Sequence, residues 1–256
     1  MPMQLDIGAI KAESRSLLRT GSVNPFRMTL FYLLIALVLD TINSGVSYMI
    51  DSAGGFTVLS FSFVSILVGL VALVLNAGYY CYCLGILRRE EMPYESLFDA
   101  FPFAGKVILL SIVEGVFIFL WSMLFVIPGI IAAYRYSFAM LNLCENPELG
   151  VMEALDLSKQ QTNGYKMQLF LLQLSFIGWS LLVLGIFLIY ELLVAALLPD
   201  SFLGIMFGSL LLSVLAAGVG VYLTPYLNLS ICRFYQLATA PQVNEPPHFD
   251  SWNDNF

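Results

Sequence analysis

Long runs of apolar residues alternate with short polar stretches along this chain, and these runs determine the expected fold. Six runs can form helices that cross the hydrocarbon layer of a bilayer, which takes about 20 residues. The run 107–144 is too long for one crossing, and Pro128 and Gly129 supply a helix break that folds it into a hairpin. The predicted fold is all-α, a polytopic membrane bundle of six transmembrane helices. The expected spans are 26–50, 57–86, 107–127, 129–144, 167–198 and 202–224.

The polar stretches between these spans carry almost all of the positive charge. Six crossings leave every Lys and Arg on one side of the membrane except Arg135, which lies inside the fourth span. The opposite turns, around Asp51, Pro128 and Asp200, contain neither residue type. By the positive-inside rule, both termini are therefore expected to be cytoplasmic. The residues on that side are Lys11, Arg15, Arg19, Arg27, Arg88, Arg89, Lys106, Lys159, Lys166 and Arg233.

Amphipathic elements are expected on the cytoplasmic side. Residues 5–20 form a helix that we expect on the membrane surface, its basic side toward anionic headgroups; the alternative is a cytosolic helix packed on the loops. A second interfacial helix is expected at 147–163, opened by Asn146 and closed by Gly164. The loop 88–106 is expected to form another such element. The apolar face of the first helix consists of Ile7, Ile10, Ser14, Leu17 and Leu18.

Composition agrees with a membrane protein and narrows the partners. The 256 residues are 59% hydrophobic and 11% charged, whereas soluble domains are about a quarter charged. The net charge of −7 is spread over loops and tail, and no basic stripe with aromatic residues favours nucleic acid. Residues 1–240 are expected to form one membrane domain, followed by a disordered tail at 241–256. The expected partners are membrane lipids and either a second copy or another membrane protein.

Four ionisable residues lie within the predicted spans and are the candidate site: Asp40, Glu114, Arg135 and Glu191. A charge at membrane depth costs roughly 2.5 to 3.5 kcal/mol, so such groups usually pair or serve a function. The helical rise puts Asp40, Arg135 and Glu191 at a similar depth, with Glu114 nearer the cytoplasm. We expect a polar cavity that accepts an ion, a proton or a lipid headgroup. The alternative is that Arg135 only neutralises the carboxylates and pins the helices together.

Catalysis is not expected from this sequence. The only histidine, His248, lies in the tail, and no pairing of a nucleophile with a base can be assigned. The four cysteines lie near cytoplasmic ends of spans, where thiols stay reduced, and no disulfide is needed. A metal site or cofactor is not expected, because two of the cysteines are two residues apart and point in different directions on a helix. These cysteines are Cys81, Cys83, Cys144 and Cys232.

Ordered motifs beyond the Pro-Gly break carry a family resemblance. LFVIPGII at 124–131 is followed by RYSFAM at 135–140, ENPEL at 145–149 and Gly164. This order resembles the uncharacterised bacterial multi-pass membrane family called domain of unknown function 975. It resembles, more faintly, the membrane domain fused to some glycerophosphodiester phosphodiesterases. The resemblance implies a six-helix bacterial plasma-membrane protein without an established activity.

Two functions from different classes follow as expectations. The first is a non-enzymatic membrane protein that binds or moves a small or amphiphilic, lipid-like ligand through the cavity near Asp40, Arg135 and Glu191. Modulation of membrane or envelope processes belongs to the same expectation. The second is a scaffold or accessory subunit that recruits a partner through its cytoplasmic amphipathic elements.

Overall fold

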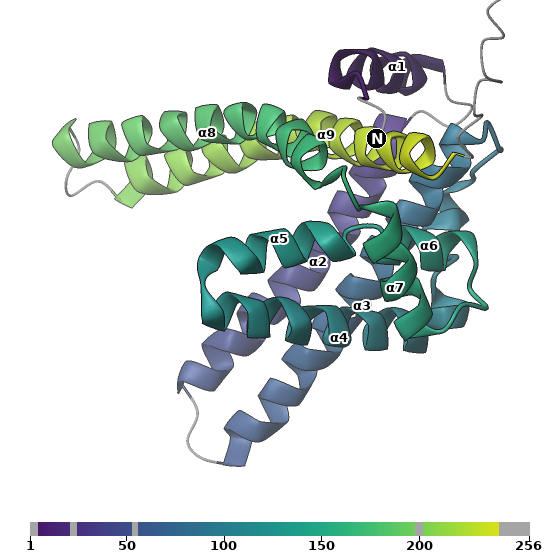
Figure 1. Ribbon diagram of the computed structural model, residues 1–256. Coiled ribbons are helices and arrows are strands. Elements are labelled where there is room, and N and C mark those ends of the chain that lie inside the picture. Colours follow the sequence, from purple (N-terminus) through teal and green to yellow (C-terminus); the bar gives the residue numbers. More distant parts are fainter. Residues whose placement is uncertain (1–4, 21–24, 53–55, 198–201, 241–256) are drawn as a thin grey trace, which may run out of the picture.

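The structure is a computed structural model that describes residues 5–20, 25–52, 56–197 and 202–240 (Figure 1). Across these ranges the regular structure is helical and contains no strand, which confirms the all-α class. The α-helices and the two 3₁₀-helices, η1 and η2, follow in chain order. They are α1 (Ile7–Thr20), α2 (Pro25–Ser52), α3 (Phe56–Leu87), η1 (Tyr94–Phe98), η2 (Phe101–Phe103), α4 (Ala104–Leu124), α5 (Val126–Tyr136), α6 (Ala139–Glu145), α7 (Val151–Gln161), α8 (Lys166–Leu197) and α9 (Phe202–Thr239).

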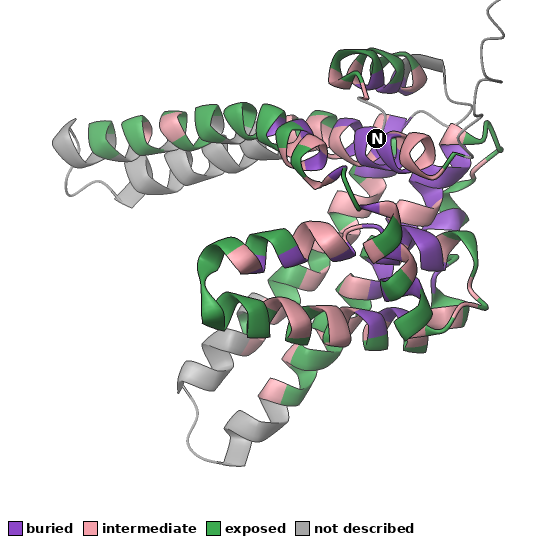
Figure 2. Cartoon of the chain, in the orientation of Figure 1, coloured by how far each residue is buried: buried purple, intermediate pink, exposed green. Residues whose placement is uncertain are grey.

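Three helical hairpins, α2–α3, α4–α5 and α8–α9, extend as arms from a common base (Figure 1). The base consists of η1, η2, α6, α7 and the ends of α3 and α9, with α1 beside α9. Buried residues gather at this base, whereas exposed residues cover the described parts of the arms (Figure 2). The packed core therefore joins the hairpins at one end. It is centred on large side chains such as Tyr79, Leu97, Phe138, Leu141 and Phe234.

The arms carry large apolar side chains on their exposed surfaces. Met123, Val126 and Leu192 are 71%, 73% and 73% exposed. Exposing apolar surface to water costs about 25 cal/mol of free energy for each Å², whereas contact with lipid carries no such cost. The described residues contain five helical stretches long and apolar enough to cross a membrane, as a multi-pass membrane protein requires. These stretches are Pro25–Asn43, Ser62–Leu87, Tyr94–Leu124, Val126–Glu145 and Lys166–Tyr190.

The sixth predicted span, 202–224, coincides with the first part of α9, whose side chains up to residue 217 lie outside the described ones. The helix also continues to Thr239, well past the predicted end. The reason is that its last turns bury Leu229, Cys232 and Phe234 in the base. The predicted tail, 241–256, lies outside the described residues.

The α4–α5 hairpin is present, but the chain reverses at Phe125, which has extended backbone angles (φ −162°, ψ 156°). Pro128 and Gly129, the predicted break, instead occupy the first turn of α5, where a missing proline N–H costs no helical hydrogen bond. A Cβ on Gly129 would lie 2.9 Å from the Cβ of Ser122 and 3.0 Å from its Cα. Gly129 thus lets the two helices approach closely next to the turn.

Helix α1 buries the face that its sequence pattern predicts, but it does so against other helices. Ile10, Ser14 and Leu18 are buried, and α1 packs along α9. Two of its basic residues lie over aromatic rings: the Lys11 ammonium is 4.4 Å from the Phe176 centroid, and the Arg15 guanidinium is 5.6 Å from the Tyr226 centroid. Burial, and secondarily the charge of Arg15, lowers the Lys11 pKa. The apolar face of α1 is thus covered by other helices of the chain, and its expected position on the membrane surface stays a prediction.

The two long loops also differ in detail from the predicted helices. Residues 88–106 form η1 and η2, because Pro93 and Pro102 interrupt any longer helix there. The expected helix at 147–163 is α7, which begins only at Val151. Its start is late because Asn146 still bonds back into α6, through its N–H to the Asn142 carbonyl oxygen (2.9 Å). Gly164, with φ 86°, ends the turn after α7 as expected.

Candidate functional site

The predicted fourth span is not one continuous helix, because α5 ends at Tyr136 and α6 begins at Ala139. Such a break removes backbone hydrogen bonds that a membrane segment must replace. Two hydroxyls, one from Ser158 in α7 and one from Thr162 just past its end, lie at the break. Ser158 Oγ accepts the Phe138 N–H (3.2 Å) and donates to the Arg135 carbonyl oxygen (2.9 Å). Thr162 Oγ1 lies 3.2 Å from the same oxygen. The backbone of Arg135 is therefore held by α7.

The side chain of Arg135 is half-buried in the last turn of α5. Among the described residues, no carboxylate lies within 4.0 Å of its guanidinium. A guanidinium stays protonated and offers five N–H donors. The adjacent Tyr134 hydroxyl donates to Gln173 Oε1 (2.8 Å) and ties α5 to α8. The arrangement presents a fixed positive charge without a described acidic partner in a stretch that can cross a membrane.

The predicted acids do not form an ion-pair cluster with Arg135 in the described part of the chain. Asp40 is exposed on α2. Glu114 is half-buried on α4, one turn after the buried Leu110 and on the same face of the helix. Glu114 precedes Phe117 by about one helical turn, and the Phe117 ring stacks at 5.8 Å on Tyr136, which directly follows Arg135. Glu191 belongs to α8, but its side chain is outside the described ones. The common depth of Asp40, Arg135 and Glu191 stays a prediction.

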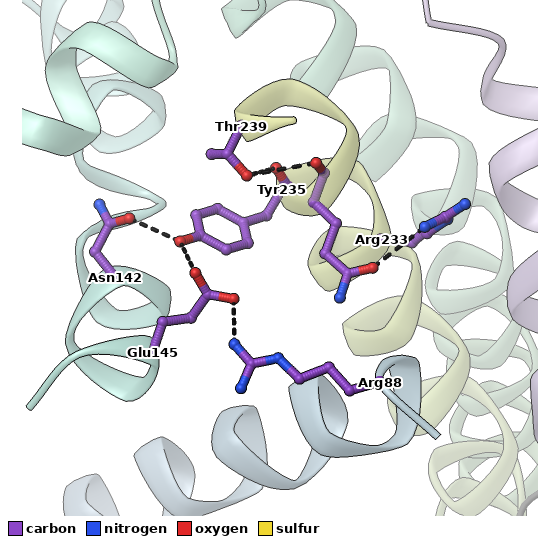
Figure 3. Close-up of polar contacts among 7 residues, drawn as sticks. Arg88, Asn142, Glu145, Arg233, Tyr235 and Thr239 are labelled. Atoms are coloured by element: carbon purple, nitrogen blue, oxygen red, sulfur yellow. Dashed lines mark hydrogen bonds and ion pairs between the residues drawn. The ribbon is translucent and has the colours of Figure 1, made fainter. Parts of the chain in front are cut away.

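A second polar group, which sequence reasoning missed, lies in the base (Figure 3). Arg88 Nη2 is 2.6 Å from Glu145 Oε1, and the other oxygen of this carboxylate is 2.8 Å from the Tyr235 hydroxyl. That hydroxyl is also 2.9 Å from Asn142 Oδ1, while Asn142 Nδ2 donates to Gln161 Oε1 (2.9 Å). These contacts join α3, α6, α7 and α9, and we call them the base network.

The base network had one weak signal in the sequence. Asn142 and Glu145 are three residues apart and so share a face of α6. Their partners, Arg88 and Tyr235, are distant in the sequence, so no local pattern could have paired them. The phenol has a single proton, and the charged carboxylate is its stronger acceptor. At the exposed end of the base network, Glu145 already has Arg88 as its ion-pair partner. We therefore interpret the base network as a set of contacts that joins helices.

Metal ligands do not converge in the part of the chain that the structure describes: no group of three or more His, Cys, Asp or Glu side chains could hold an ion there. All four cysteines are free thiols. Among the described residues, the half-buried Arg135 guanidinium has N–H donors without an acidic partner. It can bind an anion, and phosphate and carboxylate oxygens match its donor geometry.

Comparison with known proteins gives one match. Residues 123–241 match the model of a family described as Protein of unknown function (DUF975). No curated protein and no solved structure matches the chain. The fainter likeness to the membrane domain of glycerophosphodiester phosphodiesterases receives no support from these comparisons. The matched range contains α5 to α9, and with them Arg135, the helix break and most of the base network.

Proposed function

We propose that this chain, which belongs to the DUF975 family, is a non-enzymatic integral membrane protein that binds an amphiphile with an anionic headgroup. The observation that carries the proposal is the Arg135 guanidinium, half-buried and without a carboxylate within 4.0 Å among the described residues. A bound phosphate group supplies the missing negative charge. Moving such a ligand between leaflets, or modulating envelope processes through it, are extensions of the same binding event.

The energetics favour a ligand over an isolated charge. A charged side chain at membrane depth costs roughly 2.5 to 3.5 kcal/mol, and an opposite charge brought by a ligand offsets that cost. Arginine binds phosphate through two parallel hydrogen bonds. The exposed apolar surfaces of the arms, for example at Ile130, Ile131 and Leu171, suit the acyl chains of the same molecule. One amphiphile can thus bind the Arg135 guanidinium with its headgroup and the apolar arms with its acyl chains.

The orientation that fits this function has the base and both termini on the cytoplasmic side of the plasma membrane. The distribution of basic residues supports it, since Arg88, Arg89 and Lys106 all belong to the connection at the base. The α4–α5 hairpin then carries Arg135 into the membrane, and its turn at Phe125 faces the other side.

Replacing Arg135 with glutamine is expected to lower the retention of anionic phospholipid by about tenfold or more. The reason is that hydrogen bonds to charged groups contribute roughly 1.5 to 3 kcal/mol, and 1.4 kcal/mol is a factor of ten. Native mass spectrometry of the purified full chain, with phosphatidylglycerol titrated into the detergent, measures the retained lipid. Arg135→Lys keeps the charge but loses the bidentate geometry, so it should retain an intermediate amount.

The control is Arg89→Asn, which removes an exposed charge at the base. Arg89 has a left-handed backbone (φ 59°), which asparagine tolerates, so the fold should be unaffected. If Arg135 only pins helices, Arg135→Gln will lower the melting temperature and leave lipid retention equal to that of the control. That result would refute the proposal.

A surface at the base supports the alternative function of a scaffold. Tyr94, Phe98 and Phe101 are 42%, 43% and 41% exposed on η1 and η2, and the rings of Phe98 and Phe101 lie 5.7 Å apart. Exposed aromatic residues are typical of binding surfaces for other proteins. Under this alternative, Arg135→Gln leaves both the retained lipid and the protein's function in the cell unchanged.

A further inference from the structure

The four cysteines lie in two pairs, each formed between α3 and another helix. The thiol of Cys144 in α6 donates to the Ala77 carbonyl oxygen in α3 (3.5 Å), so its sulfur lies against that turn of α3. Cys81 follows one turn later, and helical side chains tilt back toward the amino terminus, which directs its thiol to the same place. Cys81 and Cys144 therefore lie against the same turn of α3, where α6 packs on it.

The second pair consists of Cys83 in α3 and Cys232 in α9, which belong to the same buried core where these two helices pack. Cys81 and Cys83 point in different directions, as the sequence predicts, and each therefore meets a different helix. The pairs differ in access: Cys81 and Cys144 are half-buried, whereas Cys83 and Cys232 are both 0% exposed. A small reagent can reach the first pair, and the second pair provides a control within the same chain.

We propose that Cys81 and Cys144 form an oxidisable thiol pair, a modification site at which a disulfide joins α3 to α6. The oxidant is a hydroperoxide. One thiolate attacks the peroxide, breaking its O–O bond to give a sulfenic acid and, for hydrogen peroxide, water; the second thiol then displaces a second water and forms the S–S bond. Two S–H bonds are lost, and their protons and two electrons reduce one hydrogen peroxide to two waters.

This bond acts where the hairpins meet. Cys144 directly precedes Glu145, whose carboxylate already holds Arg88 at the end of α3 and Tyr235 in α9. Helix α3 belongs to the first hairpin, while α6 continues from the second, so the disulfide fixes the first two hairpins to each other at the base. This inference is independent of the Arg135 site, because neither cysteine contacts that side chain among the interactions described.

The test uses the full wild-type chain in native membranes, treated with hydrogen peroxide and then alkylated with N-ethylmaleimide after denaturation. Peptide mass spectrometry should show the loss of two alkylatable thiols and a disulfide that links the peptides of Cys81 and Cys144. Cys83 and Cys232 should remain fully alkylated. A small dithiol added to the same sample confirms that the oxidant was active.

Two variants separate the proposed bond from other oxidation products. Cys144→Ala should abolish the disulfide and leave Cys81 alkylated or as a sulfenic acid, and Cys232→Ser should leave the disulfide unchanged. Full alkylation of all four cysteines in the wild-type chain, under conditions that oxidise the added dithiol, would overturn the proposal. Disulfides formed by Cys83 and Cys232 at an equal rate would also overturn it, because the difference in access would then be without consequence.

Discussion

Alanine in place of Gly78 is expected to lower the melting temperature of the detergent-solubilised protein by about 5 to 10 °C. A Cβ at this position would lie 2.8 Å from the carbonyl carbon of Leu97 and closer still to the carbonyl oxygen. These are backbone atoms of η1, and the Leu97 side chain is fully buried in the core. Because η1 cannot move away without opening that core, the collision is costly. Thermal unfolding followed by circular dichroism measures the change.

Gly69→Ala in the same helix is the matched control. A Cβ at Gly69 has nothing within 4 Å, and alanine is the better helix former by about 1 kcal/mol. This variant should therefore melt at or above the wild-type temperature. Equal melting temperatures for the two variants would show that η1 does not lie against α3. The packing of the base would then differ from the one described.

Replacing Asn142 with leucine is expected to cost about 2 to 4 kcal/mol, because it removes the centre of the base network. Asn142 is 2% exposed, and its amide bonds Gln161 and lies 2.9 Å from the Tyr235 hydroxyl. Leucine has a similar volume but leaves the Gln161 carbonyl without this donor. Denaturant or thermal unfolding in detergent gives the difference in stability.

Asn76→Leu serves as the control for this substitution, since Asn76 is exposed and makes only a long hydrogen bond of 3.3 Å to Tyr32. It should cost less than about 1 kcal/mol. Tyr235→Phe combined with Asn142→Leu should cost less than the sum of the single changes, because both alter one network. Additive effects would mean that the two side chains do not interact.

The helices of the arms could be predicted from sequence because their environment imposes a local pattern. A helix surrounded by lipid is apolar on all sides, so long apolar runs located α2, α3, α4 and α8 within a few residues. The end of α9 could not be found in this way. Its last turns pack in the base, where polar residues such as Arg233 are tolerated because Glu13 of α1 lies 2.8 Å away.

The break between α5 and α6 was unpredictable for a related reason. The motif RYSFAM contains neither proline nor glycine, so nothing local ends a helix at Tyr136. What stabilises the break is the pair of hydroxyls on Ser158, in α7, and Thr162, just past the end of α7. Arg135 itself was found from sequence as the single basic residue within a span. Its lack of a described acidic partner depends on tertiary structure.

Cysteine labelling can determine on which sides of the membrane the base and the hairpin turns lie. Phe125→Cys places a thiol at the turn of the α4–α5 hairpin, and Arg89→Cys places one at the base; wild-type labelling provides the background. With a membrane-impermeant maleimide, the proposed orientation predicts labelling of Phe125→Cys in intact cells and of Arg89→Cys only after permeabilisation. Labelling of both positions from the same side would contradict it.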